Sequence, residues 1–183
     1  MQLKIYSPKG CSTSAWAGGT TTELWIWPED GNYASRNFQA RISSATVNLE
    51  ESDFTALPNV VRYITPLSGR FTLSHPDGRT VTMAPLDEPY RFDGGIATHC
   101  SGKVTDFNLM LKGVEGNMTV MDGQLTVDSE ICCVYPVGGG DVTVNGKALC
   151  LESGGYAVIH LEKGEQAVIE AAKAIVCRIF INN

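Results

Sequence analysis

The sequence predicts an all-β protein with little helix, built from two β-barrels of the jelly-roll kind. Apolar and polar residues alternate with a period of two along much of the chain, which is the pattern of half-buried strands. Nineteen glycines and eight prolines supply the turns that many short strands require. A hairpin pattern that recurs after about 70 residues indicates two modules. We expect one compact unit over residues 1–183, with halves at 1–115 and 116–183 that are able to exchange strands.

In the N-terminal half, the strands are expected at residues 22–27, 38–47, 70–74, 79–83 and 105–111. Pro28 ends the first strand because proline lacks the N–H that a strand ladder needs. The second strand is long and rich in β-branched residues. Pro76-Asp77-Gly78 has the composition of a hairpin turn. Residues 53–57, which Pro58 follows, are expected to form one short helical turn.

In the C-terminal half, the strands are expected at residues 141–144, 147–151, 156–161 and 174–181. Asn145-Gly146 lies between the first two and is the strongest short signal for a hairpin. Residues 166–176 are ambiguous by composition, and their neighbours favour strands around a turn.

The two hairpins share one pattern: proline and an apolar residue, then glycine, a strand, a turn glycine and a second strand. The first copy starts at Pro66 and turns at Gly78, and the second starts at Pro136 and turns at Gly146. A true repeat would place Gly78 and Gly146 at equivalent positions of two barrels. The alternative is a chance similarity between two glycine-rich hairpins.

Composition excludes several classes of partner. Fourteen lysines and arginines against twenty aspartates and glutamates give a formal net charge of −6. We therefore expect no nucleic acid and no anionic membrane as the partner, because both need a basic surface. No run reaches the roughly 18 apolar residues that span a bilayer, and the N-terminus lacks the apolar core of a signal peptide. The expected location is the cytoplasm, and the sequence leaves open whether the chain forms a homodimer.

The cysteines and histidines do not predict a metal or any other cofactor. The six cysteines contain no Cys-x-x-Cys pair and are expected to be reduced, with Cys132 and Cys133 on opposite faces of a strand. The histidines are far apart in the sequence, so no His-x-His pair supplies a metal site. His75 is expected to be exposed at a hairpin tip, and His160 to be a core or rim residue.

Several motifs follow one another in order along the N-terminal half. The first is Trp-Ala-Gly-Gly-Thr-Thr-Thr-Glu at residues 16–23. The others are Phe38-x-x-Arg41, Phe54-Thr-Ala-Leu-Pro58 with Arg62, Leu67-x-Gly69, Phe92-Asp-Gly94 and Gly102-x-x-x-Asp106-Phe-Asn108. Together they resemble the HutD/Ves family, in which the first motif reads Trp-x-x-Gly-Gly-x-Thr-Arg-Glu. The resemblance implies a bicupin, with two cupin-like barrels (double-stranded β-helix, RmlC-like jelly roll). It also implies a link to histidine degradation or stress response, without an established catalytic activity.

The chain departs from this family pattern at two positions. Thr22 stands where the family usually has arginine, and Asn59 where it usually has glycine. The change at Thr22 removes a candidate cation, so the family's ligand cannot simply be transferred to this chain.

A candidate ligand pocket follows from alternation along the strands together with the resemblance. Arg41 and Ser43 share one strand face, Asp106 and Asn108 share another, and Thr21 and Glu23 are expected to align with Trp25 and Trp27. The residues expected to bind the ligand are Trp16, Thr20, Thr21, Glu23, Arg41, Ser43, Arg62, Asp106 and Asn108. In this interpretation Arg41 is the main anion anchor, assisted by Arg62 and Asn108. The alternative is that Arg41 faces solvent or forms a structural ion pair with Glu23 or Asp106.

Three functions remain open at this point. The first is a binding or regulatory bicupin that holds a small acidic metabolite without metal; the resemblance implies formyl- or formimino-glutamate as the candidate. The second is a metal-free isomerase or lyase in which Glu23 or Asp106 acts as general base. The third is a structural or interaction module that acts through an exposed β surface.

Overall fold

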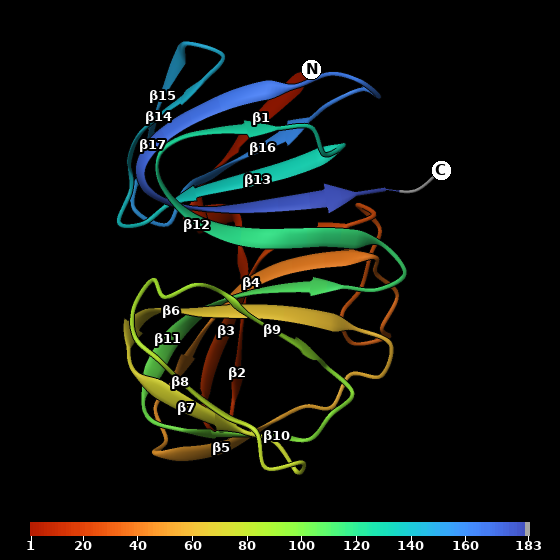
Figure 1. Ribbon diagram of the computed structural model, residues 1–183, viewed down its shortest axis with the longest axis vertical. Helices are drawn as coiled ribbons and strands as arrows, with labels where there is room; N and C mark the ends of the chain where they lie inside the picture. The colour runs from red at the N-terminus through yellow and green to blue at the C-terminus, as the bar shows by residue number, and fades with distance from the viewer. Residues whose placement is uncertain (182–183) are drawn as a thin grey trace. The chain divides into compact units, whose positions relative to one another are not determined.

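The computed structural model describes residues 1–181, which form seventeen strands and one short 3-10 turn, η1 (Pro8–Gly10). The predicted all-β class is therefore confirmed. The chain divides into two compact units: the N-terminal unit is Cys11–Gly113, and the C-terminal unit combines Met1–Gly10 with the chain from Val114 onward. The first ten residues belong to the C-terminal unit because β1 (Gln2–Tyr6) pairs along its length with β16 (Tyr156–His160). In Figure 1 the red β1 lies beside the blue β16.

The N-terminal unit contains two antiparallel sheets. The six-stranded sheet has the order β2 (Ser12–Trp16), β3 (Gly19–Trp27), β4 (Ala40–Val47), β11 (Val104–Leu111), β6 (Val61–Gly69) and β9 (Tyr90–Asp93). The four-stranded sheet has the order β5 (Glu51–Phe54), β10 (Thr98–Ser101), β7 (Phe71–Ser74) and β8 (Thr80–Met83). Buried side chains of both sheets, such as Ile64 and Leu73, belong to one hydrophobic cluster. The two sheets therefore pack face to face, as in a small β-barrel or sandwich.

The C-terminal unit is one large antiparallel sheet. Its strands are β1, β16, β13 (Ile131–Pro136), β17 (Ala167–Phe180), β14 (Gly140–Val144) and β15 (Lys147–Leu151), with β12 (Glu115–Val127) paired to β17. The long ribbons β12 and β17 run side by side in Figure 1. The aliphatic cluster of this unit includes Val134, Val142, Ile159 and Ile169, which are completely buried. Because β17 pairs on its other side with both β13 and β14, it connects the two parts of this sheet.

Both predicted hairpins are present, one in each unit. β7 pairs with β8 across Gly78, and β14 pairs with β15 across Asn145 and Gly146. Asn145 has φ 50° and Gly146 has φ 76°, which is the left-handed pair that a type I′ turn requires. The structural equivalence of the two hairpins in a pair of repeats stays a prediction.

Two of the local predictions were wrong. The expected helical turn at residues 53–57 begins as strand β5, because Phe54 and Ser52 face inward while Glu51 and Asp53 face solvent. This is a period of two, although it spans only four residues. Residues 166–176 contain no turn between two strands. From Ala167 onward they belong to the continuous strand β17, which has a β-bulge where Lys173 adopts φ 51°.

His75 is buried rather than exposed, which corrects a further prediction. Its side chain is 6% exposed, and its ring lies 3.0 Å from Tyr90 Oη and 3.3 Å from Thr98 Oγ1. The proximity of His75 to a turn suggested exposure, but the inward alternation of β7 continues through it.

The six cysteines are free thiols, and Cys100, Cys132, Cys133 and Cys177 are buried. The described residues form no helix long and apolar enough to cross a membrane.

Candidate functional site

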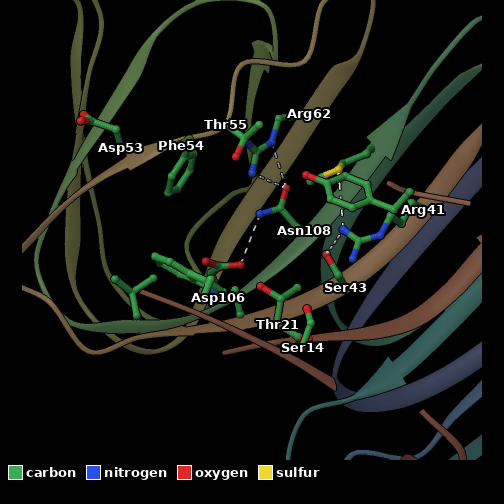
Figure 2. A pocket seen from close by; sticks show the side chains of 15 residues that line it. Ser14, Thr21, Arg41, Ser43, Asp53, Phe54, Thr55, Arg62, Asp106 and Asn108 are labelled. Atoms are coloured by element: carbon green, nitrogen blue, oxygen red, sulfur yellow. Dashed lines mark hydrogen bonds between the residues drawn. The ribbon is translucent and has the colours of Figure 1, made fainter. Parts of the chain in front are cut away.

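A pocket with a volume of about 280 Å³ lies in the N-terminal unit, on the inner face of the six-stranded sheet. Seven of the nine residues predicted to bind ligand line it: Trp16, Thr21, Arg41, Ser43, Arg62, Asp106 and Asn108. Figure 2 shows Asn108 between Arg62 and Asp106, with Thr21 near Asp106 and with Arg41 and Ser43 to one side. Apolar side chains, among them Val47, Phe54 and Met110, complete the wall.

The pairing of β4 with β11 brings the central polar residues together. Asn108 lies opposite Ser43, Met110 opposite Arg41, and Asp106 opposite Ala45. Since alternate side chains of a strand point to opposite faces, these residues all face the pocket. The intervening Phe107 and Leu109 are fully buried on the other face of the sheet. Thus the alternation predicted for residues 105–111 is confirmed.

Arg62, Asn108 and Asp106 form a hydrogen-bonded chain along one wall. Arg62 donates from Nε and Nη2 to Asn108 Oδ1, at 3.3 and 3.2 Å, and Asn108 Nδ2 donates to Asp106 Oδ1 at 3.3 Å. The guanidinium of Arg62 also stacks on Phe54, with Cζ 4.7 Å from the ring centroid. All three polar residues are buried. The amide of Asn108 therefore separates the cation from the anion, and no ion pair joins Arg62 to a carboxylate within residues 1–181.

Arg41 is held in a different way. Its Nε lies 2.7 Å from Glu23 Oε2, in an ion pair whose arginine side chain is 6% exposed and whose glutamate is 29% exposed. Its Nη1 donates to Ser43 Oγ at 3.2 Å, and Cζ lies 4.0 Å from the ring centroid of Tyr33. The structure thus contains the ion pair with Glu23 that was the structural alternative for Arg41. Arg41 still lines the pocket, but part of its donor set is occupied.

Burial shifts the pKa values of the two charged groups on the Asn108 wall. It raises the pKa of Asp106 to about 6, although the hydrogen bond from Asn108 and the charge of Arg62 act in the opposite direction. Burial also lowers the pKa of Arg62 to about 10, against the attraction of Asp106. Arg62 is therefore charged at neutral pH, while Asp106 titrates close to it.

Two of the predicted site residues lie outside the pocket lining. Thr20 pairs with Thr46 on β4 and is exposed, because it alternates with Thr21, which does line the pocket. Glu23 is not a lining residue and contacts the pocket through Arg41. Trp16, at the mouth, is 41% exposed, and its ring covers Gly18 so closely that a Cβ built there would lie 2.0 Å from Trp16 Cζ3.

A β-bulge in β3 overturns the expected alignment of Trp25 and Trp27 with Thr21 and Glu23. The register shifts between Glu23 and Trp25, so that Glu23 pairs with Ser43, but Trp25 pairs with Ile42. After this extra residue, the tryptophans face the side of the sheet that carries Ile42, away from the pocket. The two tryptophan rings stack on each other, with their centroids 6.1 Å apart.

The structure also explains the two departures from the family pattern. Thr22 alternates with the pocket residue Thr21, and its hydroxyl lies 2.8 Å from that of Thr13, so this position does not face the pocket. Asn59 has φ 63°, in the left-handed region where asparagine is among the best tolerated residues after glycine.

Two aromatic residues of the site were missed from the sequence. Tyr33 lies between Arg36 and Arg41, with their Cζ atoms 4.3 and 4.0 Å from its ring centroid. It belongs to the connection between β3 and β4, where no periodicity indicates a direction. Phe54 was assigned to a helical turn, and the alternation of residues 51–54 was the signal that would have found it.

No group of three or more histidine, cysteine, aspartate or glutamate side chains in residues 1–181 has an arrangement suited to a metal ion. The nearest approach is His99, whose ring nitrogens contact Asp53 and Glu51. Cys100 follows His99 but is completely buried, on the opposite face of β10. His99 is therefore not placed to activate the thiol.

The chain belongs to the HutD family, whose model matches residues 9–179. It is similar to the structure of HutD from Pseudomonas fluorescens SBW25, with a TM-score of 0.84, 19% identity and 100% of both chains covered. It is also similar to a conserved protein of unknown function from Pseudomonas aeruginosa PAO1, with a TM-score of 0.83, 20% identity and 100% of both chains covered. A cupin 2 conserved barrel domain protein from Leptotrichia buccalis has a TM-score of 0.59 and 14% identity, over 100% of this chain and 98% of that one. The predicted cupin-like fold is confirmed. No curated protein matches the chain.

Proposed function

We propose that this HutD-family protein binds a small acidic metabolite in the pocket of its N-terminal unit and acts as a binding or regulatory protein of histidine utilisation. The candidate ligand is N-formyl- or N-formimino-glutamate. This proposal depends mainly on one observation: Arg62 is a buried cation whose side-chain hydrogen bonds go to a neutral amide oxygen.

A buried charge without a counterion is costly, so a site of this kind favours an anion. Arg62 directs its Nε and Nη2 to Asn108, and Nη1 has no hydrogen-bond partner in the described part of the chain. Its stacking on Phe54 and Phe92 fixes the plane of the guanidinium. A carboxylate that enters the pocket would supply the missing counterion through charge-assisted hydrogen bonds. For this reason we assign the main anchor to Arg62, and a supporting role to Arg41.

The rest of the pocket suits an amide-bearing dicarboxylate. A volume of about 280 Å³ is near the lower end of ligand sites and accommodates about a dozen non-hydrogen atoms. Arg41, which like Arg62 lies across from Met110 of β11, offers a second cationic contact. Ser14, Thr21 and Thr55 offer hydroxyls. Ala45, Val47 and Met110 provide apolar surface for a short methylene chain.

Calorimetric titration with N-formyl-L-glutamate tests this proposal. Charge-assisted hydrogen bonds contribute roughly 1.5 to 3 kcal/mol, so Arg62→Met should weaken binding by about 10- to 100-fold. Arg62→Lys should recover only part of this loss, because lysine lacks the planar donor fork. Arg41→Lys should have a smaller effect. Arg79→Lys, at an exposed ion pair with Asp77 on the β7–β8 hairpin, is the matched control. Equal affinities of the wild type and both Arg62 variants would contradict the proposal.

An enzymatic function is the second candidate, and the raised pKa of Asp106 favours it. A carboxylate with a pKa of about 6 is suited to general-base catalysis near neutral pH. Glu23 is less suited, because Arg41 occupies its carboxylate outside the pocket lining. If the protein is an isomerase or lyase, turnover of the bound ligand should rise with pH through about 6 and disappear in Asp106→Asn. Saturable binding without turnover would favour the binding protein.

A further inference from the structure

We propose that the pocket takes up its anionic ligand together with one proton, which Asp106 holds while the ligand is bound. This inference rests on the proposed function, because it concerns the same pocket. It assigns Asp106 as the group through which pH controls binding.

The position of Asp106 is the first argument. Its carboxyl lines the pocket and is 2% exposed. Its carboxyl accepts a hydrogen bond from Asn108 Nδ2 at 3.3 Å and one from the backbone N–H of Ala45, and Asp106 forms no ion pair within residues 1–181. In Figure 2 the carboxyl faces the space that Arg62 and Asn108 also border. A ligand carboxylate bound to Arg62 would therefore share a poorly solvated cavity with a second carboxylate.

The charges around Asp106 do not cancel this repulsion. The charged and titratable groups that line the pocket or act on Asp106 are Arg62 of β6, Arg41 of β4, Asp53 of β5, Cys100 of β10 and Tyr33. Glu23 neutralises Arg41, and Asp53 at the rim contacts His99. Burial raises the pKa of the Cys100 thiol to about 11, so this thiol is neutral. Arg62 is thus shared between Asp106 and any incoming anion.

Protonation of Asp106 removes this competition. Two carboxylates that share a buried site cannot both stay ionised at low cost, so an anion beside Asp106 raises its pKa further. The free pocket already holds Asp106 at a pKa of about 6. The proton comes from solvent, and no covalent bond forms or breaks. The neutral carboxyl then presents an O–H donor to the ligand in place of a negative charge.

Titration of the wild type in two buffers with different ionisation enthalpies measures the proton uptake directly, with N-formyl-L-glutamate as the probe. We expect close to one proton per ligand at pH 7.5, where the ligand carboxylates are themselves ionised. Affinity should fall by more than about 10-fold from pH 6 to pH 8, because uptake of one proton gives up to tenfold per pH unit. Asp106→Asn should take up no proton and bind equally at both pH values. Asp122→Asn, an exposed carboxyl in the C-terminal unit, should behave as the wild type.

The two proposals fail in different ways. Wild-type binding that takes up no proton and is independent of pH would overturn this inference and leave the proposed function standing. The absence of wild-type binding at both pH 6 and pH 8 would overturn both. If Asp106→Asn does not fold, carbon NMR of the Asp106 carboxyl in the wild type replaces it. Its pKa should rise when ligand is added, and an unchanged or lower pKa would refute proton capture.

Discussion

Asp106→Asn should remove a pH dependence of stability that the wild type shows without any ligand. The pKa of Asp106 is raised from an ordinary value of 3.8 to about 6 in the folded chain, mainly by burial. A group whose pKa is higher in the folded state stabilises that state in full below the unfolded pKa. This contribution is lost as the pH rises through the folded pKa. The relevant window therefore runs from about pH 4 to pH 7.

The size of the effect follows from the shift. Each pKa unit corresponds to about 1.4 kcal/mol, so the full shift is worth about 3 kcal/mol. Much of this contribution to the free energy of unfolding is lost below pH 5, and the loss between pH 5 and pH 8 is about 1.5 kcal/mol. Over that range the wild type should lose this much free energy of unfolding relative to Asp106→Asn. The variant should thus be the relatively more stable protein at the alkaline end.

Urea unfolding of both proteins at pH 5, 6, 7 and 8 measures this difference. The isosteric amide keeps an acceptor for Asn108, so the comparison isolates the charge. Asp122→Asn controls for the general loss of one carboxylate. Parallel stability curves of the wild type and Asp106→Asn would refute the argument. A wild type that gains stability with pH relative to the variant would show instead that Arg62 holds Asp106 in its charged form.

Three further results are expected. Glu23→Gln leaves the buried Arg41 without its carboxylate and should lower the free energy of unfolding by about 1 to 3 kcal/mol, as measured in urea. The loss is smaller than for a fully buried pair because Glu23 is partly exposed to solvent. An unchanged free energy of unfolding would show that the ion pair does not stabilise the fold. Gly69→Ala places a methyl 2.4 Å from Lys103 O at φ 78° and should cost clearly more stability than Gly78→Ala, which has φ 86° and open space around it. Equal losses of stability in the two variants would exclude a steric clash at Gly69. A thiol reagent should label the exposed Cys150 rapidly in the native protein, and Cys150→Ser should remove this fast phase, because most other thiols are buried. Rapid labelling that persists in Cys150→Ser would contradict the structure.

Sequence periodicity was sufficient wherever a strand is regular along its whole length. The alternation in residues 105–111 assigned Asp106 and Asn108 to one face and Phe107 to the other, as the structure has them. Asn145-Gly146 located a hairpin because its backbone conformation is a local property of these two residues. The same reasoning assigned Arg41 and Ser43 to the pocket.

Periodicity failed where one residue is inserted into a strand. The bulge of β3 between Glu23 and Trp25 reverses the faces of all later residues, and Trp25 and Trp27 therefore point away from the pocket. No composition signal marks this bulge. A second difficulty concerns β5. Residues 51–54 alternate over only four positions, shortly before Pro58, and so short a run does not distinguish a strand from a helical turn.

The sequence by itself determined the fold class, the two hairpin turns and most of the polar residues that line the pocket, because each depends on a few neighbouring residues. Only the tertiary structure decided which of these residues are partners. It pairs Arg41 with Glu23, and it places Asn108 between Arg62 and Asp106. The Arg41–Glu23 and Arg62–Asn108 pairs join residues that are 18 and 46 positions apart in the sequence, and their electrostatics depend on burial. Whether an arginine is paired with a carboxylate, as Arg41 is, or available to a ligand, as Arg62 is, thus depends on how the sheets pack. The low-dielectric surroundings and the counterions exist only after the strands assemble.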